Sequence, residues 1–443
     1  MKEKNILTMS IMNKYISIKE AMKKSQGLVH LRGWCYRARG NNALRFIVLR
    51  DSTDIIQCVV EKDKVSEQSW NDALKIDVEA SMELSGEIVE DKRAPTGYEI
   101  KVKEIKLIGE SIGWPIQKDQ STELLADLKH LWLRSRYMTS ILKIRSTVFE
   151  AIHEYFRSNG FYEYQSPIFQ ATQCEGGSTL FSVNYFGKPV YLAQTWQLYA
   201  EPAIFALEKI YTIAPSFRAE KSKTSRHLTE YWHAEMEVAW ATFKDIQDYG
   251  EALIKHCVKR VLEKNQEELK ILNRDTKILE KVRDTPFIRM TYDDAVKELK
   301  EKHKIEFEWG EDLRTIEEDI ISKAHEHFTI ITNYPKKVKA FYMKEDDENP
   351  EVVHGCDFIA PEGYGEIIGG SERESDLEKI KQRLIEQGED PSKYEFYLDT
   401  RRYGSVPHGG FGMGVERLIS WICHLENIKD AIPFPRTMLR VTP

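Results

Sequence analysis

Two residues of opposite charge, Arg218 and Glu220, are separated by one alanine in the segment FRAEKSKTSRHLTEYW, residues 217–232. If this part of the segment is a strand, both side chains point to the same face of a sheet. An arginine there can hold a phosphate by two parallel hydrogen bonds, and Arg226 and His227 beyond the loop can contact the rest of a polyphosphate. A solvated, charged hairpin is the alternative for this segment alone.

Two glycine-rich segments contain further charged residues. In GGFGMGVERLISW, Gly412 and Gly414 allow close approach of a flat ligand, and Arg417 lies at the start of an apolar helix. Close packing of neighbouring strands explains such glycines equally well. In GYGEIIGGSERE, Glu366 precedes Arg373.

Asp357 lies upstream of Glu366, and carboxylate oxygens are the ligands that Mg²⁺ prefers. A structural salt bridge is the alternative for each carboxylate. Arginine, histidine and acidic residues therefore recur in three segments of one region. This pattern predicts phosphate chemistry with magnesium.

The composition limits the classes of protein that fit. A chain of 443 residues is too long for one ordinary core, so two or three domains are expected. The net charge of -7 argues against a strongly polybasic nucleic-acid binder but allows a local positive face. The six cysteines form no CxxC pair, and no apolar run approaches the about 20 residues of a membrane span. These features favour a soluble cytoplasmic protein without membrane association.

The chain divides into four segments by pattern. Residues 1–26 are a lysine-rich leader, either a short amphipathic helix or loosely ordered. Residues 27–112 contain five short β-rich runs, which fit an OB-type barrel. Residues 113–135 begin with GWPIQ and are expected to form a hinge. Residues 136–443 alternate between helical and β-rich stretches, and within them 242–328 has mainly helical periodicity.

Three segments, in order, resemble the three motifs of class II aminoacyl-tRNA synthetases. GFYEYQSPIF at 160–169 is similar to motif 1, FRAEKSKTSRHLTEYW to motif 2, and GFGMGVERLISW to motif 3. The resemblance is to the aspartate, asparagine and lysine subgroup and covers nearly all of residues 27–443. It implies an α+β, multidomain protein, with an OB-fold anticodon-binding domain before a catalytic domain built on a mainly antiparallel sheet flanked by helices. It also implies a homodimer with Pro167 at the interface.

The resemblance assigns roles in ATP binding and catalysis. Arg218 would bind the α-phosphate of ATP and the carboxylate of the amino acid, and would stabilise charge at phosphorus. Arg218, Glu220 and Arg417 would be the catalytic residues, with Tyr231 stacking on adenine. The residues that would surround ATP are Arg218, Glu220, Arg226, His227, Leu228, Tyr231, Glu366, Gly414, Val415, Glu416 and Arg417.

The resemblance also implies a magnesium ion held by Glu366 together with Asp357. The family has a serine three residues after this glutamate, whereas this chain has Gly369. Whether Ser371 replaces that serine is open from the sequence.

Six residues would contact the amino acid: Glu175, Gln194, Gln197, Glu201, Arg218 and Arg373. Glu175 would bind the α-ammonium group and Arg373 the side-chain carbonyl. Aspartate-specific members have a lysine where this chain has Ala200, so a buried substrate carboxylate would lack one cation here. Glu201 can accept a hydrogen bond from an amide and would repel aspartate. APEGYGEIIGGSERE and RRYGSVPHGGFG also resemble the asparagine-specific members. Asparagine is therefore the expected substrate.

In the barrel, Phe46 and Gln57 match an aromatic residue and a glutamine that stack on and read the central anticodon base in this family. Such stacking contributes roughly 1 to 3 kcal/mol per base. Phe46 and Val48 would share one face of the strand, and the sequence allows this face to point either outward or inward. A place in the barrel core is therefore the alternative for Phe46.

The resemblance thus implies a ligase that activates L-asparagine with ATP and Mg²⁺ and transfers it to the 3′ end of tRNA(Asn). One alternative is an aspartate-activating enzyme that also charges tRNA(Asn), against which Ala200 argues. Another is a paralogue that makes free asparagine, although such relatives lack the anticodon-binding barrel. A binding protein without catalytic activity would not need Arg218, Glu220, Glu366 and Arg417.

Overall fold

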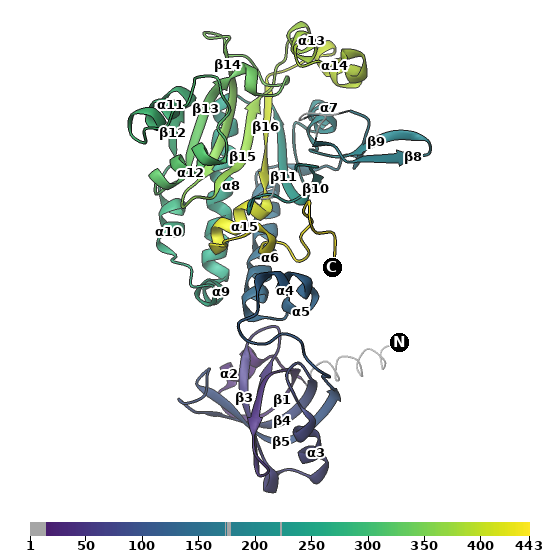
Figure 1. Ribbon diagram of the computed structural model, residues 1–443, viewed down its shortest axis with the longest axis vertical. Helices are drawn as coiled ribbons and strands as arrows, with labels where there is room; N and C mark the ends of the chain where they lie inside the picture. Colours follow the sequence, from purple (N-terminus) through teal and green to yellow (C-terminus); the bar gives the residue numbers. More distant parts are fainter. Residues whose placement is uncertain (1–14, 173, 175–178, 222–223) are drawn as a thin grey trace. The chain divides into compact units, whose positions relative to one another are not determined.

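The computed structural model describes residues 15–172, 174, 179–221 and 224–443. The chain forms two compact units, residues 1–121 and 122–443, which are described separately (Figure 1). Among the described residues, no helix combines the length and the apolar character that a membrane crossing requires.

The first unit contains a closed barrel with the strand order β1-β2-β3-β5-β4, as the five β-rich runs predicted. Alternate residues of each strand point into the barrel, so Ile47 and Leu49 are fully buried while Phe46 and Val48 face outward. The elements of this unit are α2 (Ile18–Lys24), β1 (Gly27–Gly40), β2 (Leu44–Arg50), β3 (Ile55–Glu61), η1 (Lys62–Lys64), α3 (Glu67–Lys75), β4 (Ser81–Glu90) and β5 (Tyr98–Gly109).

The second unit is built on an eight-stranded sheet with the order β12-β13-β14-β15-β16-β11-β10-β6, in which only the two outermost pairs are parallel. A smaller sheet has the order β7-β9-β8. The strands are β6 (Tyr162–Glu163), β7 (Phe169–Gln170), β8 (Ser182–Tyr185), β9 (Lys188–Leu192), β10 (Lys209–Phe217), β11 (Glu230–Ala239), β12 (Ile288–Thr291), β13 (Thr329–Pro335), β14 (Val352–Ala360), β15 (Gly365–Glu372) and β16 (His408–Gly414). The mainly antiparallel sheet that was expected is therefore confirmed.

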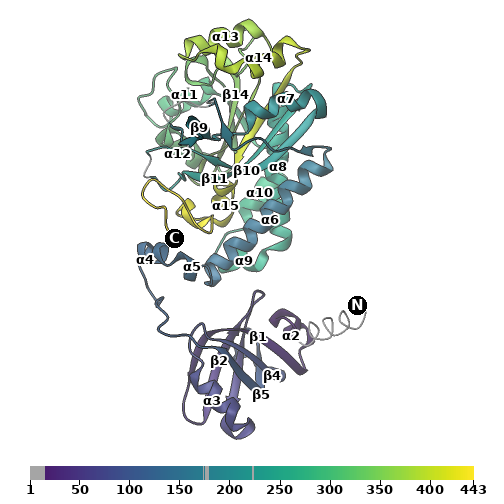
Figure 2. The same ribbon diagram turned by 90° about the vertical axis from the view of Figure 1, so that its right-hand side faces the viewer.

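Helices pack against this sheet and account for most of the remaining ordered chain. The two longest, α6 and α8, lie side by side, and α8 also contacts β15 and β16 (Figure 2). The helices are α4 (Thr122–Asp127), α5 (Lys129–Trp132), α6 (Arg136–Ser158), α7 (Gln197–Leu207), α8 (Phe243–Lys264), α9 (Gln266–Ile271), α10 (Lys277–Asp284), α11 (Tyr292–Glu301), α12 (Thr315–Ala324), η3 (Lys336–Val338), α13 (Leu377–Glu386), η4 (Pro391–Tyr394), α14 (Glu395–Arg402), α15 (Val415–Cys423) and η5 (Ile428–Asp430).

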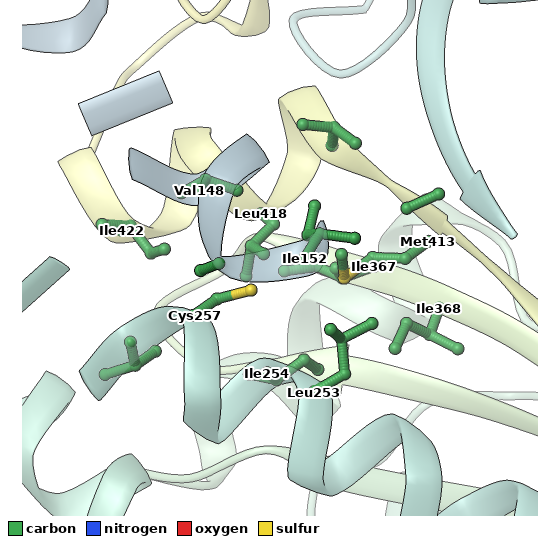
Figure 3. Close-up of a cluster of buried hydrophobic side chains, with 14 of the residues drawn as sticks. Val148, Ile152, Leu253, Ile254, Cys257, Ile367, Ile368, Met413, Leu418 and Ile422 are labelled. Atoms are coloured by element: carbon green, nitrogen blue, oxygen red, sulfur yellow. The ribbon is translucent and has the colours of Figure 1, made fainter. Parts of the chain in front are cut away.

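The main core lies where α6, α8 and α15 meet the sheet. Val148 and Ile152 on α6 face Cys257 on α8 and Leu418 on α15, all with no exposed surface (Figure 3). Apolar residues recur every three or four positions along these helices, which places them on the buried face. This packed layer supports β15 and β16 from below and leaves their other face available for a site.

The stretch 242–328 is less uniformly helical than its periodicity predicts. β12 interrupts the helices and pairs in parallel with β13, which extends the sheet by one strand. A strand of four residues is too short for its alternation of apolar and polar residues to be recognised between amphipathic helices.

Candidate active site

The hairpin of β10 and β11 positions the first pair of charged residues. Strand pairing ends at Phe217 and Glu230. Arg218 and Glu220 therefore lie just beyond β10, whereas the sequence predicted that both would lie within a strand. The Arg218 amide still donates to the Thr229 carbonyl at 3.0 Å. The two side chains remain adjacent, with Nη1 of Arg218 at 3.9 Å from Oε1 of Glu220.

The glycines of β16 form the open floor of the site. Gly412 lies between Glu235 of β11 and Gly369 of β15 in the strand register. A Cβ atom at Gly412 would collide with the His233 ring, and one at Gly410 would collide with the Met236 carbonyl. These collisions show that the glycines permit close packing of the strands. Gly412 and Gly414 also line a cavity, and the close approach of a flat ligand there stays a prediction.

The site contains two cavities, and the smaller one lies above the ends of β11 and β16. Its lining residues are Arg218, Glu220, Arg226, His227, Leu228, Tyr231, His233, Glu366, Ile367, Gly412, Gly414, Glu416, Arg417 and Ile428. The structure thus brings together all the residues that the family resemblance assigns to ATP except Val415, which is fully buried in the main core.

The charged groups of the smaller cavity are held by one another. Arg417 donates through Nη1 to the Glu366 carbonyl at 2.8 Å and lies 3.4 Å from its Oε2. Nε2 of His227 lies 3.5 Å from Oε2 of Glu220. Burial and, next, the positive charge of Arg417 lower the pKa of His227.

Glu416 lines the smaller cavity, and its carboxylate is held by other parts of the protein. Its Oε1 accepts from Nη1 of Arg145 at 2.6 Å, and its Oε2 accepts from the Trp232 amide at 2.9 Å. Burial raises the pKa of this carboxyl, and the Arg145 guanidinium opposes that shift. Glu416 therefore joins α6, β11 and α15 at the site.

Helix α12 contributes two acidic residues that the sequence did not reveal. Arg226 donates to the Asp319 carboxylate and to the Gly363 carbonyl. The neighbouring Glu318 accepts from the Glu366 amide at 3.3 Å, and burial, followed by the charge of Glu366, raises its pKa to about 7. In the sequence these residues belong to an ordinary amphipathic helix, so nothing local distinguishes them.

The two predicted metal ligands converge above a glycine. Asp357 of β14 pairs with Gly369 of β15, and an irregular register after Phe358 turns Glu366 to the same side of the sheet. A Cβ atom at Gly369 would lie 2.9 Å from Oε1 of Glu366 and 3.6 Å from Oδ1 of Asp357. The glycine therefore leaves a cradle between the carboxylates that a side chain would fill.

This cradle fits Mg²⁺, which proteins commonly bind through one or two carboxylates together with substrate phosphates. Within the described ranges no group of three or more acidic, histidine or cysteine side chains is arranged as a metal site. Ser371 is fully buried, and its Oγ accepts from Nη1 of Arg373 at 2.6 Å.

A larger cavity of about 490 Å³ adjoins the smaller one and shares Arg218, His233, Glu366 and Gly412 with it. Its other lining residues are Cys174, Thr195, Gln197, Glu235, Asp312, Lys337, Val338, Lys339, Ala340, Tyr342, Met343, Asp357, Gly369, Gly370, Arg373, Gln387 and Phe411. Arg218 therefore stands at the junction of two adjoining spaces.

Three of the six residues predicted to contact an amino acid line the larger cavity: Gln197, Arg218 and Arg373. Gln194 is buried next to it, where its Oε1 accepts from the Cys174 amide at 3.4 Å and its Nε2 donates to Thr179 at 2.7 Å. Glu175 lies outside the described residues.

Glu201 is not placed where it can touch a substrate. It is fully buried behind the cavity wall, and its Oε1 accepts from Gln197 at 2.9 Å and from Tyr397 at 3.0 Å. Its Oε2 is 2.6 Å from Nη2 of Arg401 and 3.1 Å from Nε2 of His408. The predicted direct contact is therefore corrected: these partners occupy both oxygens, and Glu201 orients Gln197 instead.

Two further acidic residues, Glu235 and Glu237, lie nearby on β11. Glu235 lines the larger cavity and accepts from the Trp196 amide at 2.9 Å and from the Thr195 hydroxyl. Glu237, only 1 % exposed, pairs with Arg373, with 3.4 Å between its Oε2 and Nε of the arginine. The alternation in HAEME, residues 233–237, is a signal that could have identified both.

In the barrel unit, Phe46 and Gln57 both lie on the outer face. Phe46 is half-buried and not part of the barrel core, and the Arg39 guanidinium lies 5.3 Å from its ring centroid. Gln57 donates to Glu99 at 3.1 Å. In the other unit, Pro167 is exposed between β6 and β7, next to the exposed side chains of Ile168 and Phe169.

Two family models match the chain. One, described as tRNA synthetases class II (D, K and N), matches residues 121–438, and the other, described as OB-fold nucleic acid binding domain, matches residues 29–108. The chain therefore belongs to the class II tRNA synthetases of the D, K and N group.

Its relatives within this group include asparagine–tRNA ligases. That of Thermoplasma acidophilum is 47% identical over 97% of this chain and 100% of the relative, and that of Thermococcus gammatolerans is 46% identical over 94% and 96%. Among solved structures, asparaginyl-tRNA synthetase from Pyrococcus horikoshii complexed with asparaginyl-adenylate has a TM-score of 0.94 and 42% identity, covering 97% of this chain and 100% of that one.

Proposed function

We propose that this protein is an asparagine–tRNA ligase, which joins L-asparagine to ATP as asparaginyl-adenylate, releases pyrophosphate, and transfers the asparaginyl group to the 3′ end of tRNA(Asn). Relatives with this activity in their names match the chain from end to end at nearly half of all positions. The observation that carries the choice of amino acid is the buried pair of Arg373 and Glu237.

Only Arg373 of this pair lines the larger cavity, and Glu237 is buried behind it with both carboxylate oxygens on the guanidinium. The carbonyl of a side-chain amide can accept from Arg373. Glu237 already balances the charge of this arginine, so the neutral side chain of asparagine needs no further charged partner. Aspartate would bring a second carboxylate beside Glu237, and the arginine charge is already balanced. Ala200 has no charged group and is packed in an apolar cluster with Trp196 and Ile204. The position where aspartate-specific members have a lysine therefore provides no cation.

ATP is assigned to the smaller cavity, with Tyr231 beside the adenine and Arg226 and Arg417 beside the outer phosphates. Arg218 then lies where the α-phosphate meets the carboxylate of the amino acid. Its guanidinium can hold both reacting groups and stabilise the charge that develops as the carboxylate attacks phosphorus and pyrophosphate leaves. Glu220 orients Arg218 and His227, since it lies within 3.9 Å of both.

Asp357 and Glu366 are the residues that would hold Mg²⁺, which would neutralise phosphate charge when bound. The barrel would bind the anticodon through Phe46 and Gln57, with residues 27–112 as the anticodon-binding domain, 113–135 as the hinge and 136–443 as the catalytic domain. A cytoplasmic homodimer joined near Pro167 completes the proposal, which the exposed Ile168 and Phe169 support.

The test is ATP–pyrophosphate exchange measured in parallel with asparagine and aspartate. We expect exchange with asparagine and at most a trace with aspartate. Exchange with aspartate alone would contradict the assignment and favour an aspartate-activating enzyme. Charging of a tRNA(Asn) transcript, but not of one with an altered anticodon, would then support the role of the barrel.

A further inference from the structure

Lys339 is a cation inside the larger cavity that the proposed function does not use. It follows the short helix η3, and its Nζ lies 2.7 Å from Oδ2 of Asp357. Both side chains are only 15% exposed. The ammonium group also lies 3.8 Å from the ring centroid of Tyr334, which is itself buried. Lys339 is thus fixed on one of the two carboxylates of the magnesium cradle.

The surroundings keep this lysine charged. Besides Asp357, which it contacts directly, the acidic residues Asp312 and Glu366 line the same cavity. Removing the ammonium would leave Asp357 without this partner, whereas Glu366 would keep Arg417. Lys339 therefore places a positive charge beside one of the two carboxylates that would hold a metal ion.

The two cations compete for the same carboxylate. Oδ1 of Asp357 faces the cradle above Gly369, whereas Oδ2 is bonded to Lys339. A divalent ion in the cradle would lie close to the ammonium group and be repelled by it. ATP changes this balance, because its phosphates bring several negative charges and offer both the metal and the lysine new oxygen partners.

We propose that Lys339 is the resident counter-cation of Asp357 and makes divalent-cation binding depend on ATP. In the free protein the ammonium group weakens metal binding at Asp357 and Glu366. When ATP enters, the flexible lysine side chain turns from Asp357 to the phosphates, and the metal takes the carboxylate. The inference rests on the proposed function only in requiring that the adjoining cavity binds ATP.

The test measures binding of Mn²⁺, a hard divalent probe with the same preference for oxygen ligands, to the full-length protein without nucleotide. The electron paramagnetic resonance signal of free Mn²⁺ reports the bound fraction. We expect Lys339→Met to bind Mn²⁺ about tenfold more tightly than the unaltered protein, since one repulsive charge is removed. Adding Asp357→Asn to Lys339→Met should abolish the gain.

Lys337→Met is the matched control, because Lys337 lines the same cavity with the same charge but makes no bond to Asp357. It should bind Mn²⁺ like the unaltered protein. Lys339→Arg, which keeps the charge, should also behave like the unaltered protein. If Lys339→Met lacks a normal melting transition, Lys339→Gln replaces it in the comparison.

Equal Mn²⁺ affinity of the charge-removing variant and the unaltered protein would overturn the proposal, as would tight binding by the unaltered protein without nucleotide. With a non-hydrolysable ATP analogue present, the difference between the two proteins should shrink; a difference that persists unchanged would contradict the proposed movement of the lysine. These readouts do not depend on asparagine. Failure of pyrophosphate exchange with asparagine would instead count against the proposed function.

Discussion

Arg373, which lines the larger cavity, forms an ion pair with Glu237 although 136 positions separate the two residues in the chain. Arg373 follows β15 and is 4 % exposed, and Glu237 lies on β11 and is 1 % exposed. Burial makes each charge costly without the other, so the pair behaves as one polar unit. The cavity therefore presents a balanced surface to a substrate side chain instead of a free cation.

Replacing Glu237 by glutamine should shift selectivity from asparagine towards aspartate. The substitution leaves Arg373 without its carboxylate partner, so a substrate carboxylate can take that place. We expect pyrophosphate exchange with asparagine to fall and exchange with aspartate to rise, which changes the ratio of kcat/KM values by about tenfold or more. Exchange measured with both amino acids checks this.

Ser371→Ala is the control for that substitution. It removes a neutral partner of Arg373 and leaves the charge balance intact. The asparagine to aspartate ratio should then stay as in the unaltered protein. If Glu237→Gln also leaves the ratio unchanged, the pair does not select the amino acid.

Arg218→Ala should reduce pyrophosphate exchange by about 100-fold or more, which is the usual effect of removing one group that stabilises developing charge. The side chain stands where the two cavities join, so its loss should affect the chemical step. Arg218→Lys keeps the charge but cannot form two parallel hydrogen bonds, so its exchange rate should lie between those of the unaltered protein and Arg218→Ala. An unchanged melting transition would show that the fold is intact, and retained exchange would remove Arg218 from the mechanism.

Phe46→Ala should weaken tRNA charging and leave pyrophosphate exchange normal. Loss of one stacked base corresponds to roughly 1 to 3 kcal/mol, and therefore to a decrease of about 5- to 150-fold in kcat/KM for tRNA. Leu28→Ala, at a side chain of the same barrel that is 52% exposed, is the control and should charge tRNA normally. Normal charging by Phe46→Ala would exclude the stacking role.

His354 should make a pH-dependent contribution to stability. Its Nδ1 lies 2.8 Å from Glu372 and its Nε2 lies 3.0 Å from Asp346. The hydrogen bond to Glu372, together with that to Asp346, raises the pKa of His354 despite burial. Since the folded pKa is raised, the stabilisation is fully present below the ordinary value of about 6.5 and is lost as the pH rises through the folded value.

His354→Gln should therefore lower the melting temperature at pH 5.5 to 6, where the lost charged hydrogen bonding is worth roughly 1 to 2 kcal/mol. Its effect at pH 9 should be smaller. Thermal unfolding across this pH range is the measurement. Lys344→Met removes a charge that opposes protonation of His354, so it should raise the folded pKa of His354 and extend the stabilisation to higher pH. An equal decrease at both pH values would contradict the titration of His354.

Much of the architecture could be predicted because it depends on local patterns. The alternation in β2 and β3 indicated a barrel, and the apolar spacing of Ile144, Val148 and Ile152 indicated α6. The positions of Arg218 and Arg417 beside turn and glycine-rich segments likewise indicated a phosphate site. The strand β12 was missed because four residues carry too little pattern.

The sequence by itself determined which kinds of residue are available and which short segments hold them, since strand alternation, glycine spacing and motif order are properties of neighbouring residues. Only the tertiary structure decided which carboxylates reach the site. It buried Glu201 behind the wall and set Glu237 on Arg373. It also brought Asp319 to Arg226 and turned Glu366 towards Asp357. The physical reason is that strand order, one register irregularity and helix docking join residues far apart in the chain, and no local pattern specifies those contacts.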